Sequence, residues 1–276
     1  MKKKLALILA GTAMAAMVLA GCGEKNNASG EDAKTAESVE DKKTFTVGFD
    51  AEYPPYGYMD ENGEYTGFDL ELAEAVCKLE GWELVKKPLN WDSKDMELNS
   101  GSIDCIWNGF TMNGREDDYT FSTPYVDNSQ VIVVAEKSGI DTLEDLAGRT
   151  VGVQAASAAL DLLQSEEEGG QKKLADTFGA LNEFADYNTA FTELQAGALD
   201  ALAIDVGVAN YQIKSRGEGY KILDETLNTE QYAIGFKKGN QELCDVVNAD
   251  LKKRTEDGTV AKLAEKSEIA DMVTLK

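Results

Sequence analysis

The chain has 276 residues, with 27 basic and 50 acidic side chains, a formal net charge of −23 and no histidine. A charge of this sign opposes binding to nucleic acid or to anionic lipid headgroups. The lack of histidine removes the commonest general base, the commonest metal ligand and every histidine-dependent catalytic triad. We therefore predict no metal site, no cofactor and no nucleic-acid partner, in a chain long enough for one large domain or two modest ones.

Residues 1–21 have the layout of a secretory signal peptide. Three lysines at positions 2–4 precede an apolar segment, residues 5–20, that is short for a transmembrane helix. The tetrapeptide LAGC that ends at Cys22 resembles the lipobox of bacterial lipoproteins, which implies cleavage before Cys22 and a lipid on its sulfur. The rest of residues 22–43 predicts a flexible tether. The mature chain would then be extracytoplasmic and anchored by lipid to the membrane; a plain signal peptide with a coincidental cysteine is the alternative.

The other three cysteines lie far apart in the sequence, each among apolar neighbours. Cys77, Cys105 and Cys244 form neither a metal-binding motif nor a dense disulfide framework, and three thiols cannot all pair. We expect buried free thiols, with one disulfide as the alternative.

The first elements of the folded region place polar and aromatic residues after strands. Residues 44–50 alternate apolar and polar side chains and predict a strand that ends at Asp50. A stiff, aromatic loop follows and contains Tyr53, and a turn signal at 60–63 predicts a hairpin. A second strand, residues 83–89, leads into a loop that carries Trp91.

Between these strands, residues 67–80 predict an amphipathic helix. Asp69 is placed to cap its start, and Gly81 ends it. Its expected apolar stripe is Phe68, Leu72, Val76 and Leu79.

The stretch IDCIWNGFTMNGR, residues 103–115, is a short apolar run followed by a polar loop with one arginine. Asn108 and Gly109 begin the loop, so it lies at the carboxyl end of a strand, where open α/β sheets bind ligands. Arg115 offers a planar fork of donors that matches a carboxylate, and Thr111 adds a hydroxyl. The alternative is an ordinary surface turn with a solvated arginine.

The second half alternates strands and helices and predicts largely parallel sheets. Ser157 precedes a helix at about 158–166, where it serves either as the cap or beside free N–H groups that attract an anion. A strand over 198–205 ends in Asp205. The remaining expected elements are strands over 130–135, 150–154, 183–187 and 231–239, a helix-sized segment at 141–148, and helices over 188–197 and from 241 and 259.

In this order, the pieces resemble the bacterial extracellular solute-binding proteins, family 3, the polar amino-acid receptors of ABC importers. GFDLELAEAV at 67–76 looks like the family signature, and NGFT at 108–111 with Arg115 adds to the match. The segments LAGRTVGVQAAS and GALDALAID match as well, and TPYVDNSQ and QYAIGF match the usual hinge positions. Two departures are a loop with three residues instead of four between Thr111 and Arg115, and Gln154 and Ala156 at positions that are often basic and glycine.

The resemblance implies a two-lobe, type II "Venus flytrap" α/β fold, each lobe a largely parallel sheet flanked by helices. One lobe would comprise residues 44–128 and 229–276, and the other residues 129–228, joined by two crossings. The ligand would lie between the lobes, and its binding would close the hinge.

The resemblance also implies roles for single residues. Arg115 would pair with the α-carboxylate of an amino acid, with Thr111 and the amides of Ser157 and Ala158 around it. Asp205 would bind the α-ammonium, helped by the carbonyl of Gly109. The remaining site residues are Tyr53 and Trp91 around the ligand's side chain, Asp50 at its polar end, and Asn108 in the binding loop.

The implied function is the substrate-binding lipoprotein of an ABC importer. As a monomer, it would capture a polar or charged amino acid, cystine included, and deliver it to a membrane permease with its ATPase. The alternatives are an enzyme on the same scaffold, similar to a dehydratase, and a ligand-sensing ectodomain. The choice of amino acid does not follow from the sequence.

Overall fold

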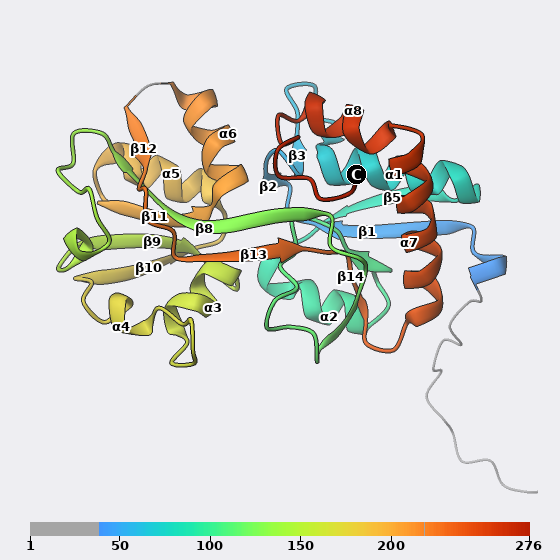
Figure 1. Ribbon diagram of the computed structural model, residues 1–276, viewed down its shortest axis with the longest axis horizontal. Coiled ribbons are helices and arrows are strands. Elements are labelled where there is room, and N and C mark those ends of the chain that lie inside the picture. Colours follow the sequence, from blue (N-terminus) through green and yellow to red (C-terminus); the bar gives the residue numbers. More distant parts are fainter. Residues whose placement is uncertain (1–38, 218) are drawn as a thin grey trace, which may run out of the picture. The chain divides into compact units, whose positions relative to one another are not determined.

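The computed structural model describes residues 39–217 and 219–276 (Figure 1). The predicted signal peptide, Cys22 and most of the predicted tether therefore lie outside the described residues. Within the described part, no helix is both long enough and apolar enough to cross a membrane.

The first lobe is built on a five-stranded sheet in the order β5-β1-β6-β14-β7. The neighbours of β1 run parallel to it, whereas β14 is antiparallel to both β6 and β7. A small antiparallel sheet, β2-β3-β4, follows β1 in the chain and contains the predicted hairpin. The strands are β1 (Thr44–Phe49), β2 (Glu52–Tyr53), β3 (Gly57–Met59), β4 (Tyr65–Thr66), β5 (Glu83–Pro88), β6 (Cys105–Ile106), β7 (Tyr119–Phe121) and β14 (Gly235–Lys237). The helices are η1 (Val39–Asp41), α1 (Phe68–Glu80), η2 (Trp91–Ser93), α2 (Lys94–Asn99), α7 (Gln241–Glu256) and α8 (Thr259–Lys266).

The second lobe has a sheet in the order β10-β9-β11-β8-β12, with β13 also paired to β8. Strands β10, β9 and β11 are parallel, and β8 is antiparallel to each of its partners. Both large sheets are mixed, but in each of them all strands except one, β14 or β8, run in the same direction. The prediction of largely parallel sheets is therefore confirmed. The strands are β8 (Val126–Ala135), β9 (Thr150–Gln154), β10 (Ala180–Phe184), β11 (Ala201–Asp205), β12 (Tyr220–Ile222) and β13 (Asn228–Tyr232). The helices are η3 (Glu144–Leu146), α3 (Ala158–Gln164), α4 (Lys172–Ala175), α5 (Tyr187–Ala196) and α6 (Val206–Arg216).

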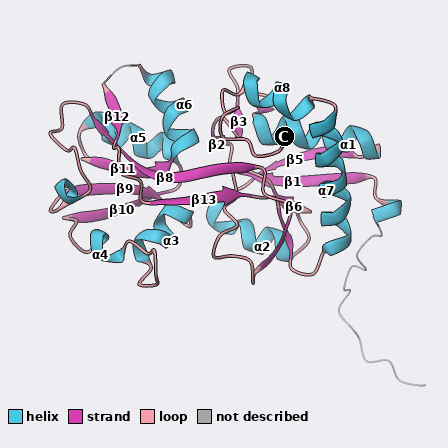
Figure 2. Ribbon diagram, viewed as in Figure 1, coloured by secondary structure: helices cyan, strands magenta, loops and turns pink. Residues whose placement is uncertain are grey.

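Strands β8 and β13 connect the two lobes. They pair along their whole shared length, from Asn228 opposite Gln130 to Tyr232 opposite Val126. Figures 1 and 2 show them running side by side from one lobe into the other, with helices on both sides of each sheet. The crossing is thus a two-stranded antiparallel ribbon.

Helix α1 confirms the predicted element but not every residue assigned to it. Gly81 ends it in the left-handed conformation, with φ 72°. Leu79 does not belong to the buried stripe because its side chain is 39% exposed at the outer end of the helix. Asp69 does not cap the helix either; the N-cap is Gly67. Instead, the fully buried Asp69 carboxylate accepts hydrogen bonds from the Gly109 N–H and the Tyr125 hydroxyl, at 2.6 and 2.8 Å.

Two other segments differ from prediction. The helix-sized segment at 141–148 contains only the short 3-10 helix η3. The strand expected over 231–239 is divided, because β13 pairs with β8 whereas β14 pairs with β6 and β7 in the other sheet. The prediction of free thiols is confirmed: Cys77, Cys105 and Cys244 are free and buried.

Candidate functional site

The carboxyl end of β11 places Asp205 in a buried hydrogen-bond network. Its side chain is 3% exposed. Asp205 Oδ1 accepts from the side-chain amides of Asn128 and Gln130 on β8, at 2.8 and 2.6 Å. It also accepts from the Tyr232 hydroxyl on β13 at 2.6 Å. Asp205 directly precedes α6, but its side chain makes no capping hydrogen bond to that helix. Its carboxylate therefore does not serve as a helix cap.

A second carboxylate shares the same donors. Glu230 on β13 is 6% exposed, and its Oε1 accepts from Asn128 Nδ2 and Gln130 Nε2, both at 2.8 Å. The Thr111 hydroxyl donates to the same oxygen at 2.8 Å. We call Asp205 and Glu230 the carboxylate pair. Burial, with the charge of Asp205 next, raises the pKa of Glu230 to about 7, and burial also raises the pKa of Asp205.

Four buried tyrosines, which we call the tyrosine cluster, surround this network: Tyr53, Tyr56, Tyr187 and Tyr232. The Tyr53 ring lies 5.9 Å from that of Tyr56 and 6.0 Å from that of Tyr187, and its hydroxyl is 3.4 Å from the hydroxyl of Tyr232. Gly109 packs against the cluster with φ 56°; a Cβ there would lie 2.9 Å from the Tyr232 ring and 3.0 Å from the Tyr53 ring. A side chain at Gly109 is therefore excluded both by space and by backbone conformation.

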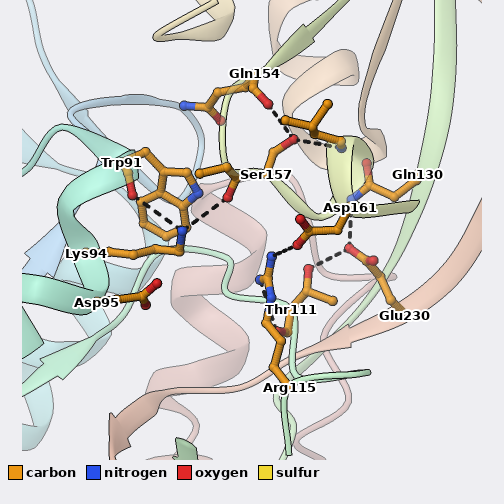
Figure 3. Close-up of polar contacts among 12 residues, drawn as sticks. Trp91, Lys94, Asp95, Thr111, Arg115, Gln130, Gln154, Ser157, Asp161 and Glu230 are labelled. Atoms are coloured by element: carbon orange, nitrogen blue, oxygen red, sulfur yellow. Dashed lines mark hydrogen bonds and ion pairs between the residues drawn. The ribbon is translucent and has the colours of Figure 1, made fainter. Parts of the chain in front are cut away.

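Arg115 lies beside this network at a cavity between the lobes. Its guanidinium donates to Asp161 on α3 at 2.7 Å (Figure 3). The guanidinium also lies 5.1 Å from the centre of the Phe110 ring. The shortened loop is a tight turn in which the Arg115 N–H donates to the Met112 carbonyl at 3.0 Å. A cavity of about 700 Å³, the charge-paired cavity, is lined among others by Lys94, Thr111, Arg115, Ala158, Asp161 and Glu230.

Ser157 has the structural role that the sequence left open. Its hydroxyl donates to the Gln154 carbonyl at 2.8 Å and accepts from the Leu160 N–H at 3.1 Å, so it caps α3. Ala156, just before it, has φ 54°, a conformation that costs less for glycine. Lys94 Nζ donates to the Ala156 carbonyl at 3.1 Å and so joins this turn to the first lobe.

Asp50 and Trp91 line a different cavity, of about 490 Å³. We call it the acidic cavity; its charged lining residues are Asp50, Glu52, Asp92, Glu183 and Asp186. Asp50 is 5% exposed and accepts from Gln154 Nε2 at 2.6 Å and from the Glu52 N–H at 2.8 Å. Burial raises the pKa of Asp50 to about 6. Trp91 packs edge-on against Phe110, with ring centres 5.9 Å apart.

Nine of the ten predicted site residues fall into three groups, and the tenth, Ser157, caps α3. Thr111, Arg115 and Ala158 line the charge-paired cavity. Asp50 and Trp91 line the acidic cavity. Tyr53, Gly109 and Asp205 belong to the tyrosine cluster and its network, with the buried Asn108 in the same loop as Gly109.

Comparison with known proteins identifies the family. A profile of the bacterial extracellular solute-binding proteins, family 3, matches residues 45–267. The chain belongs to this family. It is similar to the L-cystine-binding protein TcyJ of Escherichia coli, with 30% identity over 92% of each chain. It is also similar to the arginine-binding extracellular protein ArtP of Bacillus subtilis, with 33% identity over 96% of this chain and 98% of ArtP.

Solved structures agree with the two-lobe fold. An ABC uptake transporter substrate-binding protein from Streptococcus pneumoniae with bound histidine superposes with a TM-score of 0.80. It is 32% identical, and the match covers 86% of this chain and 96% of that protein. The fold of this family-3 chain is therefore the two-lobe fold of proteins that bind amino acids.

Sequence reasoning missed several residues of the network in this family-3 protein. Asn128 and Gln130 lie in TPYVDNSQ, which was recognised only as a hinge position, and Glu230 directly precedes the second such segment, QYAIGF. One signal was available, since Asn128 and Gln130 are two residues apart in a strand and so share a face. Glu230 is opposite Asn128 in the antiparallel register, which the sequence does not reveal. Asp161 was also missed, because its partner Arg115 is 46 residues away.

Proposed function

We propose that this chain is the substrate-binding component of an ABC importer and captures one amino acid between its lobes. The observation that carries the proposal is that a guanidinium and a buried carboxylate, Arg115 and Glu230, line one cavity between the lobes, with Asp205 next to Glu230. A buried zwitterion must be matched at both ends, or the cost of removing its charges from water dominates. The charge-paired cavity offers both partners.

In this proposal, the α-carboxylate takes the place of Asp161 on Arg115. Thr111 and the amides at Ser157 and Ala158 complete its shell, and the amides lie at the start of α3, where the helix dipole favours an anion. The α-ammonium binds at Asp205, near Gly109. Each hydrogen bond to a charged group contributes roughly 1.5–3 kcal/mol, so four such bonds exceed the roughly 8 kcal/mol of a micromolar complex. Ordering and hinge closure consume the difference.

The acidic cavity is the proposed subsite for the ligand's side chain. Its charged residues are all carboxylates, and Trp91 supplies an aromatic wall. This lining favours a polar or cationic side chain, and it also suits cystine, whose far end carries a second ammonium. Tyr53 forms part of the wall beside Asp205 rather than lining the acidic cavity.

The finer parts of the proposal concern the whole protein. We assign residues 44–128 and 229–276 to one lobe and 129–228 to the other, with lipid attached at Cys22 and a monomeric mature chain. The family is extracellular by description, which fits a chain tethered outside the cell membrane. Binding occurs without chemistry in this proposal, and the relatives TcyJ and ArtP are named for binding L-cystine and arginine.

A thermal-shift screen against the common amino acids and L-cystine tests the proposal. A compound that binds only the folded state raises the melting temperature. When its free concentration is a hundred times its Kd, it adds about 2.7 kcal/mol to the free energy of unfolding. We expect at least one polar or charged amino acid to do so and to be recovered unchanged by chromatography. A flat screen contradicts the binding proposal, and conversion of the compound contradicts binding without chemistry.

A further inference from the structure

The carboxylate pair has no cationic partner in the described part of the chain. None of the ion pairs among residues 39–217 and 219–276 includes Asp205 or Glu230. Their side-chain donors are neutral: the amides of Asn128 and Gln130 and the hydroxyls of Thr111, Tyr232 and Tyr53. Two carboxylates that share donors in a buried site repel each other, and the charged form of one is disfavoured.

The two amides that join the pair also have unused acceptors. Each amide nitrogen contacts both carboxylates, whereas Asn128 Oδ1 and Gln130 Oε1 are buried with no hydrogen-bond partner. The Asn128 and Gln130 side chains are 3% and 0% exposed. Buried amide oxygens without a donor cost free energy. The site therefore combines negative charge with unsatisfied acceptors, and it lacks donors that carry positive charge.

One member of the pair, Glu230, is also reachable from the cavity. Glu230 lines the charge-paired cavity together with Arg115 and Thr111. Figure 3 shows Thr111 between the Arg115 side chain and Glu230, with its hydroxyl directed at the Glu230 carboxylate. An ammonium has three donors and a full positive charge, which is what the pair and its amide oxygens are missing.

We propose that Glu230 is a ligand-binding residue, and that the α-ammonium of the amino acid is held between Glu230 and Asp205 rather than by Asp205 alone. This inference rests on the proposed function and deepens it. The site then selects compounds with a free primary ammonium, because an N-acylated amino acid would leave two buried carboxylates without a cation. Since Glu230 lies on β13, the bound ammonium would also directly contact the two-stranded ribbon that connects the lobes.

The charged and titratable groups around Glu230 predict proton release on binding. Asp205 lies on β11, Tyr232 on β13, Tyr56 and Tyr187 in the tyrosine cluster, and Arg115 on the same cavity. Without ligand, Glu230 carries a proton part of the time near neutral pH. An arriving ammonium favours its ionised form, so the proton leaves and affinity falls as the pH drops below about 7.

Calorimetry with L-cystine, L-arginine and L-histidine tests this inference on the wild type, Glu230→Gln and the exposed control Glu136→Gln. Titrations at pH 7 in two buffers of different ionisation enthalpy measure the protons released. We expect Glu230→Gln to weaken binding of the tightest probe at least tenfold and to abolish most of the proton release. The control variant should bind as the wild type does. The N-acetyl form of that probe should not bind.

The outcomes separate this inference from the proposed function. If the wild type binds a probe and Glu230→Gln binds it within twofold with the same proton release, the inference is wrong and the importer proposal stands. If the wild type binds none of the common amino acids, the importer proposal fails, and the inference fails with it. Should Glu230→Gln not fold, the wild type alone decides: affinity that is constant from pH 6 to 8 without proton release overturns the inference.

Discussion

The two cavities between the lobes differ in the sign of the charges that line them. The charge-paired cavity is lined by two cations, Lys94 and Arg115, and by several carboxylates, including Glu230. The acidic cavity has carboxylates as its only charged lining residues. The zwitterionic backbone that all amino acids share needs lining residues of both charges. A charged side chain, which distinguishes one amino acid from another, needs lining residues of only the opposite charge. Under the proposed function, the first cavity would recognise amino acids in general and the second would select among them.

The largest expected effect is on the charge-paired cavity, from Arg115→Ala. Because the α-carboxylate would lose its only bidentate partner, we expect at least a hundredfold loss of affinity, which corresponds to roughly 3 kcal/mol. Calorimetry with the amino acid identified by the thermal-shift screen measures it. Arg149→Ala, which removes an exposed arginine paired with Asp200 at 3.6 Å, is the control. Unchanged affinity in Arg115→Ala would remove the basis for this site.

The second prediction concerns Asp69, which supports the loop of the charge-paired cavity through Gly109. Burial raises the pKa of Asp69 from 3.8 to about 7. Between these values the folded protein binds a proton that the unfolded chain releases, so Asp69 makes stability fall as the pH rises. In the wild type, this effect lowers the free energy of unfolding by up to about 1.4 kcal/mol for each pH unit, and we expect Asp69→Asn to remove it. Urea unfolding from pH 5 to 7 measures it, and parallel curves for the two proteins would contradict it.

The third prediction concerns the selectivity of the acidic cavity. Asp50→Asn should weaken the binding of L-arginine about tenfold and leave the affinity for L-glutamine nearly unchanged. The reason is that a hydrogen bond between charged groups is lost only for the cationic ligand. As the pKa of Asp50 is about 6, arginine affinity should also fall below pH 6 in the wild type. Glu242→Gln, on the exposed face of α7, is the control. An equal loss for both amino acids would mean that Asp50 does not distinguish side chains.

The smallest expected effect comes from Asp161, which pairs with Arg115 at 2.7 Å. The Asp161 side chain is 61% exposed, and pairs of this kind contribute about 0–1 kcal/mol. We expect Asp161→Asn to strengthen ligand binding up to about fivefold, because the ligand's carboxylate no longer competes for the guanidinium. Weaker binding in this variant would instead make Asp161 a part of the liganded site.

Much of the local structure could be predicted from the sequence. The end of α1 at Gly81, the hairpin after β1 and the starts of α7 and α8 follow from glycine, turn signals and apolar periodicity within a few residues. The sequence also indicated that Asp50 and Asp205 end strands or follow them, and that Arg115 follows the apolar run. The reversed strands β14 and β8 were not predicted, because the direction of a strand in a sheet depends on partners far along the chain.

The sequence by itself determined the family, the local elements and the kinds of side chain available for an amino acid. Only the tertiary structure decided which of these side chains share a cavity. Glu230 meets Asp205 because β13 and β11 both lie against β8, and Arg115 meets Asp161 across the lobes. Local propensities act over a few residues, whereas the charges of this site act through contacts between residues that are 25 or more positions apart. For that reason, the network around the carboxylate pair became visible only in the folded chain.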